Sequence, residues 1–300
     1  MELIAITREV STSVNNCQLS FHAREPIDVA KAIAQHRAYQ DCLAELGVRV
    51  VSLPAEPELP DAVFVEDPAV VVDEVAVISI MGAPSRRPEA LSLADALSRY
   101  RPIKLLREPA TLDGGDVLRI GRRVFVGLSQ RTNWEAFSQL RGVLRAFDYQ
   151  VQSVEIRDCL HLKSACSYIG NDTILINRSW IDADRFRGFQ LLDVPDEEPA
   201  AANALLIKDI VIIPGIDISQ FRMPGFPSHA QSLGGSRRKV WHKCQTPASF
   251  PRTRALLEER GFRVRTIDLS ELQKAEAGVT CTSLIFNHEA MHASSIRSPI

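Results

Sequence analysis

The chain has 300 residues, of which 45% are hydrophobic and 24% are charged, so it can bury a sizeable core as one large domain or two ordinary ones. Its formal net charge is -2 and its isoelectric point is about 6.4. No excess of positive charge is available to attract polyanions, and we therefore expect neither nucleic acid nor an anionic membrane surface as a partner.

A recurring unit organises the chain: a polar stretch is followed by a short apolar strand, a tight turn and a second apolar strand. Its five copies lie at residues 62–78, 115–128, 164–176, 202–213 and 279–286. The first three recur about every 50 residues, a period typical of repeat architectures. The turns Asp73-Glu74, Gly121-Arg122 and Asn171-Asp172 favour hairpins whose apolar arms face a shared core.

Segments with helical periodicity separate the hairpins, and a short β-type run follows each of them. The predicted helices cover residues 28–46, 87–100, 133–147 and 251–260. The predicted strands after them cover residues 48–53, 103–106, 149–155 and 262–267. Asp28 suits the N-cap of the first helix, and Gly47 and Gly261 follow the first and last helices. The repeat is therefore hairpin, helix, strand.

A unit that cannot bury its apolar face alone must pack against its copies. Five such units predict one closed, pseudo-symmetric α/β domain over residues 1–300, with the loops at one end converging on its axis. The alternative is an ordinary α/β fold with antiparallel strands, in which the likeness of the units is coincidental. Residues 215–238, rich in Gly, Pro and Ser, break the period and predict a long loop.

The cysteines follow neither a disulfide pattern nor a zinc-site pattern. Six of them are scattered along the chain without a close pair, at Cys17, Cys42, Cys159, Cys166, Cys244 and Cys281. This spacing argues against a disulfide framework and against a thiolate zinc site. Residues 1–8 carry charge where a signal peptide would be apolar, and no later segment has the apolar length of a membrane span. We expect a cytoplasmic protein.

Polar residues recur just before or inside the first strand of each unit. They are Asp61, Glu66, Asp67, Asp113, Asp116, His161, Asn203 and Cys281. In a closed arrangement these positions meet near the axis, where carboxylates, an imidazole and a thiol would form a catalytic constellation.

Each candidate also has a structural interpretation. Cys281, flanked by small hydroxyl residues, suits a nucleophile, although an arbitrary cysteine is more often a buried apolar residue. His161 alternates with apolar neighbours and could be a hydrogen-bonded core histidine. Asp113, followed by two glycines, could simply form a turn.

Charged residues in the same regions indicate the ligand. Glu66 and Asp67 interrupt an apolar run, where an unpaired charge is expensive, so they require a cationic partner. Arg86 and Arg131 suit a carboxylate through bidentate contacts, although most loop arginines are solvated. Acids for a cation together with arginines for an anion describe an amino-acid-like ligand.

At these residues the sequence resembles the dimethylarginine dimethylaminohydrolases, which belong to the guanidine-modifying, or pentein, superfamily. The resemblance covers nearly the whole chain. The matching strings are LPDAVFVEDPAVV at 59–71, GAPSRRPE at 82–89, TLDGGDVL at 111–118, VGLSQRTN at 126–133, LHLKSACS at 160–167 and TCTS at 280–283. It implies a five-bladed α/β propeller fold.

The resemblance also implies roles for single residues. Cys281 matches the nucleophile, His161 the general acid/base and Asp113 the carboxylate that orients the histidine. The implied substrate contacts are the acids Asp61, Glu66 and Asp67, the carboxylate-binding pair Arg86 and Arg131, and the backbone or pocket contacts Leu19 and Ala275. Leu19 and Ala275 lie outside the matching strings.

The implied reaction is hydrolysis of Nω-methylated arginine to citrulline and methylamine or dimethylamine. The thiolate of Cys281 attacks the guanidinium carbon, His161 protonates the departing amine, and a covalent thiouronium intermediate is hydrolysed. Nucleophile and proton shuttle are both side chains, so we expect no metal and no organic cofactor. Residues 215–238 and the region Trp241 to Cys244 depart from the family pattern, which leaves the exact guanidino substrate open.

Two rival functions follow from the same residues. A related enzyme of the superfamily, such as a deiminase, would use the same nucleophile on arginine or another guanidino compound. A non-catalytic propeller could instead bind a ligand, or hold zinc through Cys281 and His161. The complete set of Cys281, His161 and Asp113 argues against the second rival. The sequence leaves open whether the protein forms a homo-oligomer.

Overall fold

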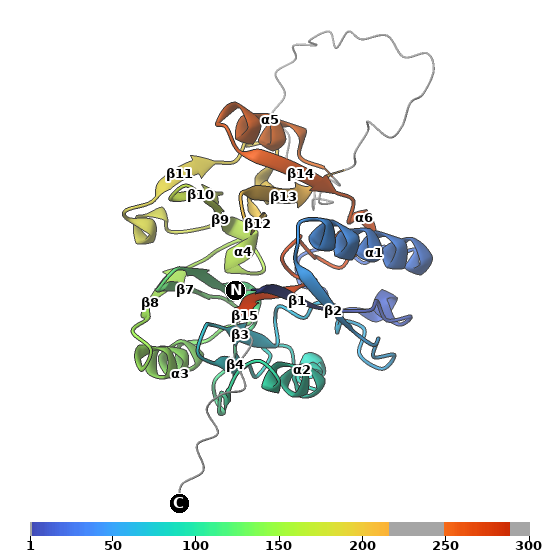
Figure 1. The fold of residues 1–300 in the computed structure, drawn as a ribbon, viewed down its shortest axis with the longest axis vertical. Helices are drawn as coiled ribbons and strands as arrows, with labels where there is room; N and C mark the ends of the chain where they lie inside the picture. Colours follow the sequence, from blue (N-terminus) through green and yellow to red (C-terminus); the bar gives the residue numbers. More distant parts are fainter. Residues whose placement is uncertain (1, 216–248, 289–300) are drawn as a thin grey trace, which may run out of the picture.

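The computed structural model describes residues 2–215 and 249–288, in which fifteen strands form five three-stranded sheets arranged around a common centre (Figure 1). The first sheet contains β15 (Leu284–His288), β1 (Glu2–Arg8) and β2 (Arg49–Leu53). The second contains β3 (Ala69–Val71), β4 (Ala76–Ile78) and β5 (Ile103–Leu105), and the third β6 (Val117–Ile120), β7 (Arg123–Leu128) and β8 (Gln150–Glu155). The fourth contains β9 (Cys166–Gly170), β10 (Thr173–Ile176) and β11 (Gln190–Asp193), and the fifth β12 (Leu205–Ile207), β13 (Ile210–Pro214) and β14 (Arg263–Ile267).

Every sheet has the same topology. Its first and middle strands are antiparallel, and the third strand runs parallel to the middle strand. In the third sheet, for example, Val117 pairs with Val126 across the hairpin and Arg123 pairs with Gln150 across the parallel ladder. A parallel neighbour requires a crossover connection, which explains why a helical segment precedes each third strand. The predicted order of hairpin, helix and strand is confirmed.

The crossover helices agree with the sequence prediction in four sheets. They are α1 (Val29–Glu45), α2 (Glu89–Ser98), α3 (Trp134–Arg145) and α5 (Pro251–Glu259). Asp28 caps α1 by accepting a hydrogen bond from the Lys31 amide, as predicted, and Asn133 caps α3 in the same way. In the fourth sheet the crossover contains only the 3₁₀-helix η4 (Ala183–Phe186). The other short helices are η1 (Val14–Asn16), η2 (Pro84–Arg86), η3 (Gly114–Asp116), α4 (Leu162–Ala165), η5 (Pro199–Ala202) and α6 (Ser270–Gln273).

The hydrophobic core is divided among the boundaries between neighbouring sheets. In the middle strand β7, Val124 and Val126 pack toward the second sheet, whereas Phe125 packs toward the fourth. The other middle strands divide their residues between two neighbours in the same way. Because successive side chains of a strand point to opposite faces, a strand between two neighbours must be apolar on both faces. The five clusters therefore close a ring, and the predicted five-bladed propeller is confirmed.

The fifth copy of the sequence repeat differs from its prediction. Residues 279–286 do not form a hairpin of their own. They contribute only the start of β15, whose antiparallel partner is the N-terminal strand β1, with Glu2 opposite His288. The two ends of the described chain thus share one sheet, which joins the last unit to the first. Cys281 consequently lies in the turn before β15 and not within a strand.

The first strands of all five sheets surround a cavity of about 310 Å³. We call it the axial cavity; residues of β3, β6, β9, β12 and β15 line it. The segments that precede these strands converge at one end of the axis and carry the polar residues singled out in the sequence.

Some predictions lie outside the described residues. The predicted loop at 215–238 is described only at Gly215, and the region Trp241 to Cys244 is not described. The assignment of residues 1–300 to one domain therefore stays a prediction. Among the helices in the described residues, none has the length and apolar character needed to cross a membrane.

Candidate active site

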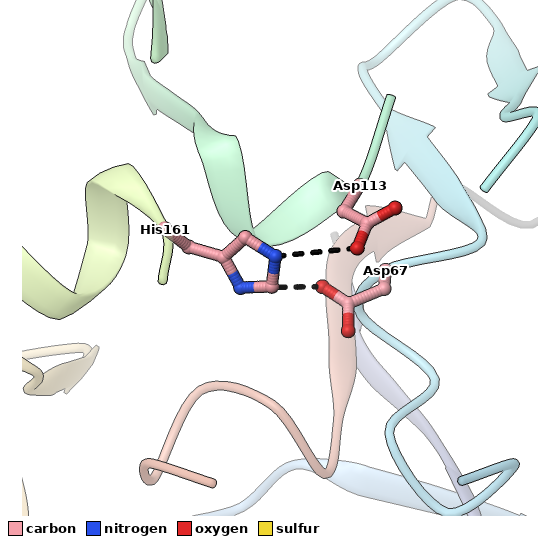
Figure 2. A group of neighbouring side chains, drawn as sticks. All are labelled: Asp67, Asp113 and His161. Carbon is pink, nitrogen blue, oxygen red and sulfur yellow. Dashed lines mark hydrogen bonds and ion pairs between the residues drawn. The ribbon is translucent and has the colours of Figure 1, made fainter. Parts of the chain in front are cut away.

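His161 lies against two carboxylates at the converging end of the propeller (Figure 2). Its Nε2 is 3.3 Å from Asp113 Oδ2, and its Nδ1 is 4.0 Å from Asp67 Oδ1. Asp113 immediately precedes η3, Asp67 lies in the turn before β3, and His161 is the N-cap residue of α4. All three side chains are buried. Three different sheets therefore contribute to one polar cluster, which we call the imidazole corner.

Backbone amides hold the two carboxylates of the imidazole corner in place. Gly82 N donates to Asp113 Oδ1 at 2.8 Å, and Gly115 N donates to Asp67 Oδ1 at 3.0 Å. Glycine is required at position 115, because a Cβ atom there would lie 2.5 Å from His161 Nδ1. The paired glycines after Asp113 thus permit the imidazole to approach the backbone.

A third carboxylate, Asp116, fixes the segment that carries His161. Its Oδ1 accepts a hydrogen bond from Leu162 N at 2.9 Å, and its Oδ2 accepts hydrogen bonds from the hydroxyls of Ser129 and Thr132 at 2.6 Å. Burial raises the pKa of Asp116 to about 6, although His161 and these donors oppose the shift. Asp116 is thus a positioning residue for His161.

The charge state of His161 follows from these neighbours. Burial by itself would lower its pKa, but the carboxylates of Asp67, Asp116 and Asp113 outweigh burial and raise the pKa to about 9. In the same way burial opposes ionisation of Asp67, yet His161 and Arg86 lower its pKa. At neutral pH the imidazole therefore carries a proton that it can donate.

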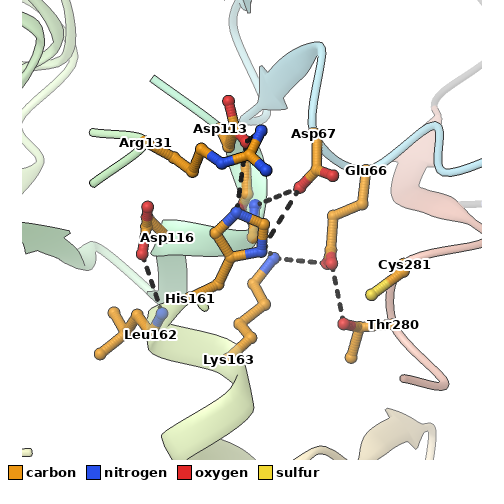
Figure 3. Close-up of polar contacts among 12 residues, drawn as sticks. Glu66, Asp67, Asp113, Asp116, Arg131, His161, Leu162, Lys163, Thr280 and Cys281 are labelled. Atoms are coloured by element: carbon orange, nitrogen blue, oxygen red, sulfur yellow. Dashed lines mark hydrogen bonds and ion pairs between the residues drawn. The ribbon is translucent and has the colours of Figure 1, made fainter. Parts of the chain in front are cut away.

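Cys281 lies across the site in the turn before β15 (Figure 3). Gly278 N donates a hydrogen bond to its Sγ at 3.3 Å, and its carbonyl oxygen accepts one from Glu66 N at 3.2 Å. Burial, together with the charges of Glu66 and Asp67, raises the pKa of the thiol to about 12. At neutral pH Cys281 is therefore a neutral thiol.

A hydrogen-bonded ion pair at this end of the axis lines the axial cavity. Lys163 Nζ lies 2.5 Å from Glu66 Oε1, and Thr280 Oγ1 donates to Glu66 Oε2 at 2.8 Å. Asn203 Nδ2 donates to Thr280 Oγ1 and to the carbonyl oxygen of Lys163. Glu66 thus obtains the cationic partner that its apolar surroundings require, and that partner is Lys163, which the sequence analysis did not name.

The two predicted carboxylate-binding arginines have different surroundings. Arg86 is 6% exposed and already paired, because its guanidinium donates to both oxygens of Glu89 at 3.0 Å and to Asp67 Oδ2 at 2.9 Å. Arg131 donates through Nη2 to Ser20 Oγ at 2.9 Å. Its Nη1 is buried, finds no hydrogen-bond acceptor among the described residues and lies 3.9 Å from Asp113 Oδ2. Arg131 therefore has an unused donor for an anionic group.

The remaining predicted contacts lie around the N-terminal segment that contains Leu19. Both carboxylate oxygens of Asp61 accept a hydrogen bond from Gln18 N, at 3.0 and 3.1 Å. Ala275 is buried next to Glu276, whose carboxylate accepts hydrogen bonds from the backbone of residues 20–22. Leu19 and Ala275 thus lie in two segments that contact each other.

A cavity of about 1050 Å³, which we call the active-site cavity, opens beside these groups. Cys281 and His161 both line it, and so do Phe21, His22 and Glu276. A ligand in this space has simultaneous access to the thiol and to the imidazole.

The site could also be considered for a metal ion. Asp67, Asp113 and His161 each offer a ligand atom within 4.8 Å of the others. These atoms are already used, since Asp67 pairs with Arg86 and with Gly115 N, and Asp113 accepts from Gly82 N. A protonated imidazole is also not a metal ligand. The arrangement fits a proton-transfer group better than a metal centre.

Comparison with known proteins identifies the family. A family model described as eukaryotic N,N dimethylarginine dimethylhydrolase matches residues 4–285. The chain belongs to the dimethylarginine dimethylaminohydrolase family. It is 31% identical over 283 residues to the N(G),N(G)-dimethylarginine dimethylaminohydrolase of Pseudomonas aeruginosa, covering 94% of this chain and 98% of that protein. It is also 31% identical over 281 residues to the enzyme of the same name from Streptomyces coelicolor, covering 93% and 95%.

A solved structure of this family has the same fold. The structure of a DDAH mutant from Pseudomonas aeruginosa complexed with citrulline matches with a TM-score of 0.79 and 29% sequence identity, covering 95% of this chain and 100% of that chain. The family and fold predicted from the sequence strings are therefore confirmed.

Proposed function

We propose that this chain hydrolyses Nω-methylated arginine, asymmetric dimethylarginine or monomethylarginine, to citrulline and dimethylamine or methylamine. The observation that carries the proposal is that a neutral thiol, Cys281, and a charged imidazole, His161, line one cavity in a member of this family. Asp113, 3.3 Å from His161, orients the ring. No metal or organic cofactor takes part in the proposed reaction.

The charged residues near Cys281 and His161 suit a guanidino amino acid. The carboxylates of Asp61, Asp67 and Glu66 offer negative charge to a guanidinium group. The unused Nη1 of Arg131 offers a donor to the substrate carboxylate. Arg86 contributes to this pattern through Asp67, to which it is bound at 2.9 Å. Leu19 and Ala275 complete the proposed contacts with backbone or pocket atoms.

Because Cys281 is protonated, the substrate itself must promote formation of the nucleophile. A thiol whose pKa is about 12 is a poor nucleophile at neutral pH. A guanidinium group bound beside it favours the thiolate, because an opposite charge stabilises the ionised form. The thiol proton then passes to water as the substrate binds. The nucleophile therefore forms only when a cationic substrate is present.

The first chemical step forms the C–S bond. The thiolate of Cys281 attacks the guanidinium carbon, and the tetrahedral carbon that results loses the methylated nitrogen. The imidazolium of His161 gives its proton to that nitrogen as the C–N bond breaks, so the amine leaves neutral. An S-alkylthiouronium group remains on Cys281, and His161 is now uncharged.

The second step releases the product. Neutral His161 takes a proton from a water molecule, and the hydroxide attacks the thiouronium carbon. The C–S bond breaks, the proton of the added hydroxyl passes to the departing sulfur, and citrulline and the Cys281 thiol are left. His161 is protonated again, and the same residue has acted first as acid and then as base.

The test measures citrulline release from asymmetric dimethylarginine, monomethylarginine and arginine under identical conditions. We expect citrulline from the two methylated substrates and none from Cys281→Ser. Cys159→Ser is the matched control, because Cys159 lines the same cavity and should be dispensable. A preference for arginine would change the assignment to a deiminase, and failure to release citrulline from any of the three would contradict the proposal.

Location and assembly are separate parts of the proposal. The scattered cysteines favour the cytoplasm, which fractionation of the native host would test. Self-association into a homo-oligomer is the partner interaction that we consider, and sedimentation of the purified protein would test it.

A further inference from the structure

Glu276 binds the backbone of a segment that is distant in the sequence. The amides of Ser20, Phe21 and His22 all donate to its carboxylate, at 3.0, 2.6 and 2.6 Å. Successive N–H groups that converge on one acceptor group form a nest, a geometry that binds anions. The carboxylate of Glu276 therefore fixes the direction of this segment through its main chain.

The same segment contacts two residues that we assign to substrate binding. Gln18 N donates to Asp61, and Ser20 Oγ accepts from Arg131 Nη2 at 2.9 Å. Leu19 lies between these two anchored positions. We call residues 18–22 the N-terminal strap. Its hold on Asp61, Arg131 and Glu276 arranges one wall of the binding site.

Glu276 also belongs to the segment that leads to the thiol. Two residues further on, Gly278 N donates to Cys281 Sγ at 3.3 Å. Glu276 has a φ angle of 62°, in the left-handed region that favours glycine. A long acidic side chain is kept there against a steric cost, which points to a use for its carboxylate. Glu276, Phe21, His22 and Cys281 line the active-site cavity together.

We infer that Glu276 is a positioning residue for the reaction, which holds the N-terminal strap in the conformation that binds substrate. The inference rests on the proposed function for its kinetic consequence. Without the carboxylate, the strap must be ordered by each substrate molecule, and the apparent affinity falls in proportion to the ordered fraction. The substrate constant KM rises, whereas kcat changes little because Cys281 and His161 are untouched.

Two substitutions distinguish the effect of the Glu276 carboxylate from the effect of the backbone conformation at that position. Glu276→Gly removes the side chain at a φ angle that glycine adopts freely, so loss of the fold is not expected. Glu276→Gln keeps the shape and one acceptor oxygen but removes the charge. Glu258→Gln is the control, because it makes the same change in net charge at an exposed position on α5, paired with Arg254.

The experiment combines two measurements. Steady-state kinetics with asymmetric dimethylarginine should show KM raised about tenfold in Glu276→Gly, which corresponds to an ordered fraction of about one tenth, and less in Glu276→Gln. Values of kcat should stay within about twofold. Hydrogen exchange in the ligand-free protein should show faster exchange of the amides of residues 20–22 in both variants. The control should match the wild type in both measurements.

The outcomes decide between roles. A fall in kcat with unchanged KM would overturn the inference, because Glu276 would then act on the chemistry. Wild-type kinetics and wild-type exchange in Glu276→Gly would also overturn it. If the wild-type protein releases no citrulline, the proposed function fails, and hydrogen exchange alone decides: faster exchange supports the hold on the strap, and unchanged exchange rules it out.

Discussion

The imidazole corner and the turn that contains Cys281, residues 279–282, which we call the thiol turn, differ in how they are built. His161 is enclosed by Asp67, Asp113 and Asp116, and most of the carboxylate oxygens there accept hydrogen bonds from backbone amides, hydroxyls or Arg86. Within the described residues, the sulfur of Cys281 accepts one hydrogen bond, from Gly278 N, and Cys281 lies in a turn that packs against apolar residues.

One carboxylate, Asp67, acts on both groups with opposite consequences for charge. Together with Asp116 and Asp113 it raises the pKa of His161 to about 9, which leaves the imidazole positive. Burial, with the charges of Glu66 and Asp67, raises the pKa of the Cys281 thiol to about 12, which leaves the thiol neutral. A negative field retains protons on any group within it. In the proposed mechanism, the imidazole of His161 is therefore already charged, whereas the thiol of Cys281 ionises only beside a cationic substrate.

The first prediction concerns His161, the proposed general acid, whose replacement should have the greatest effect. His161→Ala should lower kcat by about 10²- to 10⁴-fold, the range for loss of general acid–base catalysis. The measurement is steady-state citrulline release, with thermal unfolding as a check on the fold. A kcat within tenfold of the wild type would remove His161 from the chemistry.

The carboxylates around the imidazole of His161 should affect the pH dependence of kcat/KM. Because a group with a raised pKa is protonated below it, kcat/KM should fall as the pH rises through about 9. Asp113→Asn removes a carboxylate that raises this pKa, so the alkaline limb should move to lower pH by about one unit, or tenfold in rate on that limb. An unmoved limb would mean that another group titrates there.

The same carboxylates should make the contribution of His161 to the unfolding free energy depend on pH. The pKa of His161 is above its unfolded value of 6.5, so its contribution is full below pH 6.5 and is lost as the pH rises through about 9. The difference in unfolding free energy between the wild type and His161→Gln should therefore shrink from pH 6.5 to pH 9.5. Urea titrations at several pH values measure it, and a difference that grows over this range would refute the assignment.

Asp67 links the two regions, so its removal should change both in the same direction. Asp67→Asn should lower the pKa of Cys281, since that carboxylate helps to raise it. Alkylation by iodoacetamide at pH 8.5 should become several-fold faster, because one pKa unit is tenfold in thiolate. Intact mass over time gives the rate, with Cys281→Ser to identify the site. Slower alkylation in Asp67→Asn would contradict the effect of Asp67 on the thiol.

The smallest effect concerns the support of the thiol turn. Tyr39 on α1 is buried, and its hydroxyl lies 2.9 Å from the carbonyl oxygen of Val279 and 2.6 Å from Ser283 Oγ. Tyr39→Phe should cost about 1–2 kcal/mol of unfolding free energy. Tyr100→Phe, which loses only one long surface contact with Arg49, is the matched control. Equal stabilities of the two variants in urea would contradict this role.

Some of the candidate site could be predicted from the sequence because its signals are local. The glycines after Asp113 and the acids inside an apolar run at 62–71 are visible as anomalies in their own strings. The partners of these residues come from distant segments, and no local signal reveals them. Lys163 pairs with Glu66 from 97 positions away, and Glu276 reaches Ser20 across 256 positions. Glu89 had a weak signal, its spacing of three from Arg86.

The alternation of apolar and polar segments by itself determined the unit of hairpin, helix and strand, because periodicity and turn residues act over short distances. The sequence strings also identified the family. Only the tertiary structure decided that β1 completes the last unit, and that Arg86 is paired whereas Arg131 keeps an unused donor. It also decided that His161 and Cys281 are both protonated at neutral pH. These properties depend on burial and on charges brought together from several sheets, which no single stretch of sequence contains.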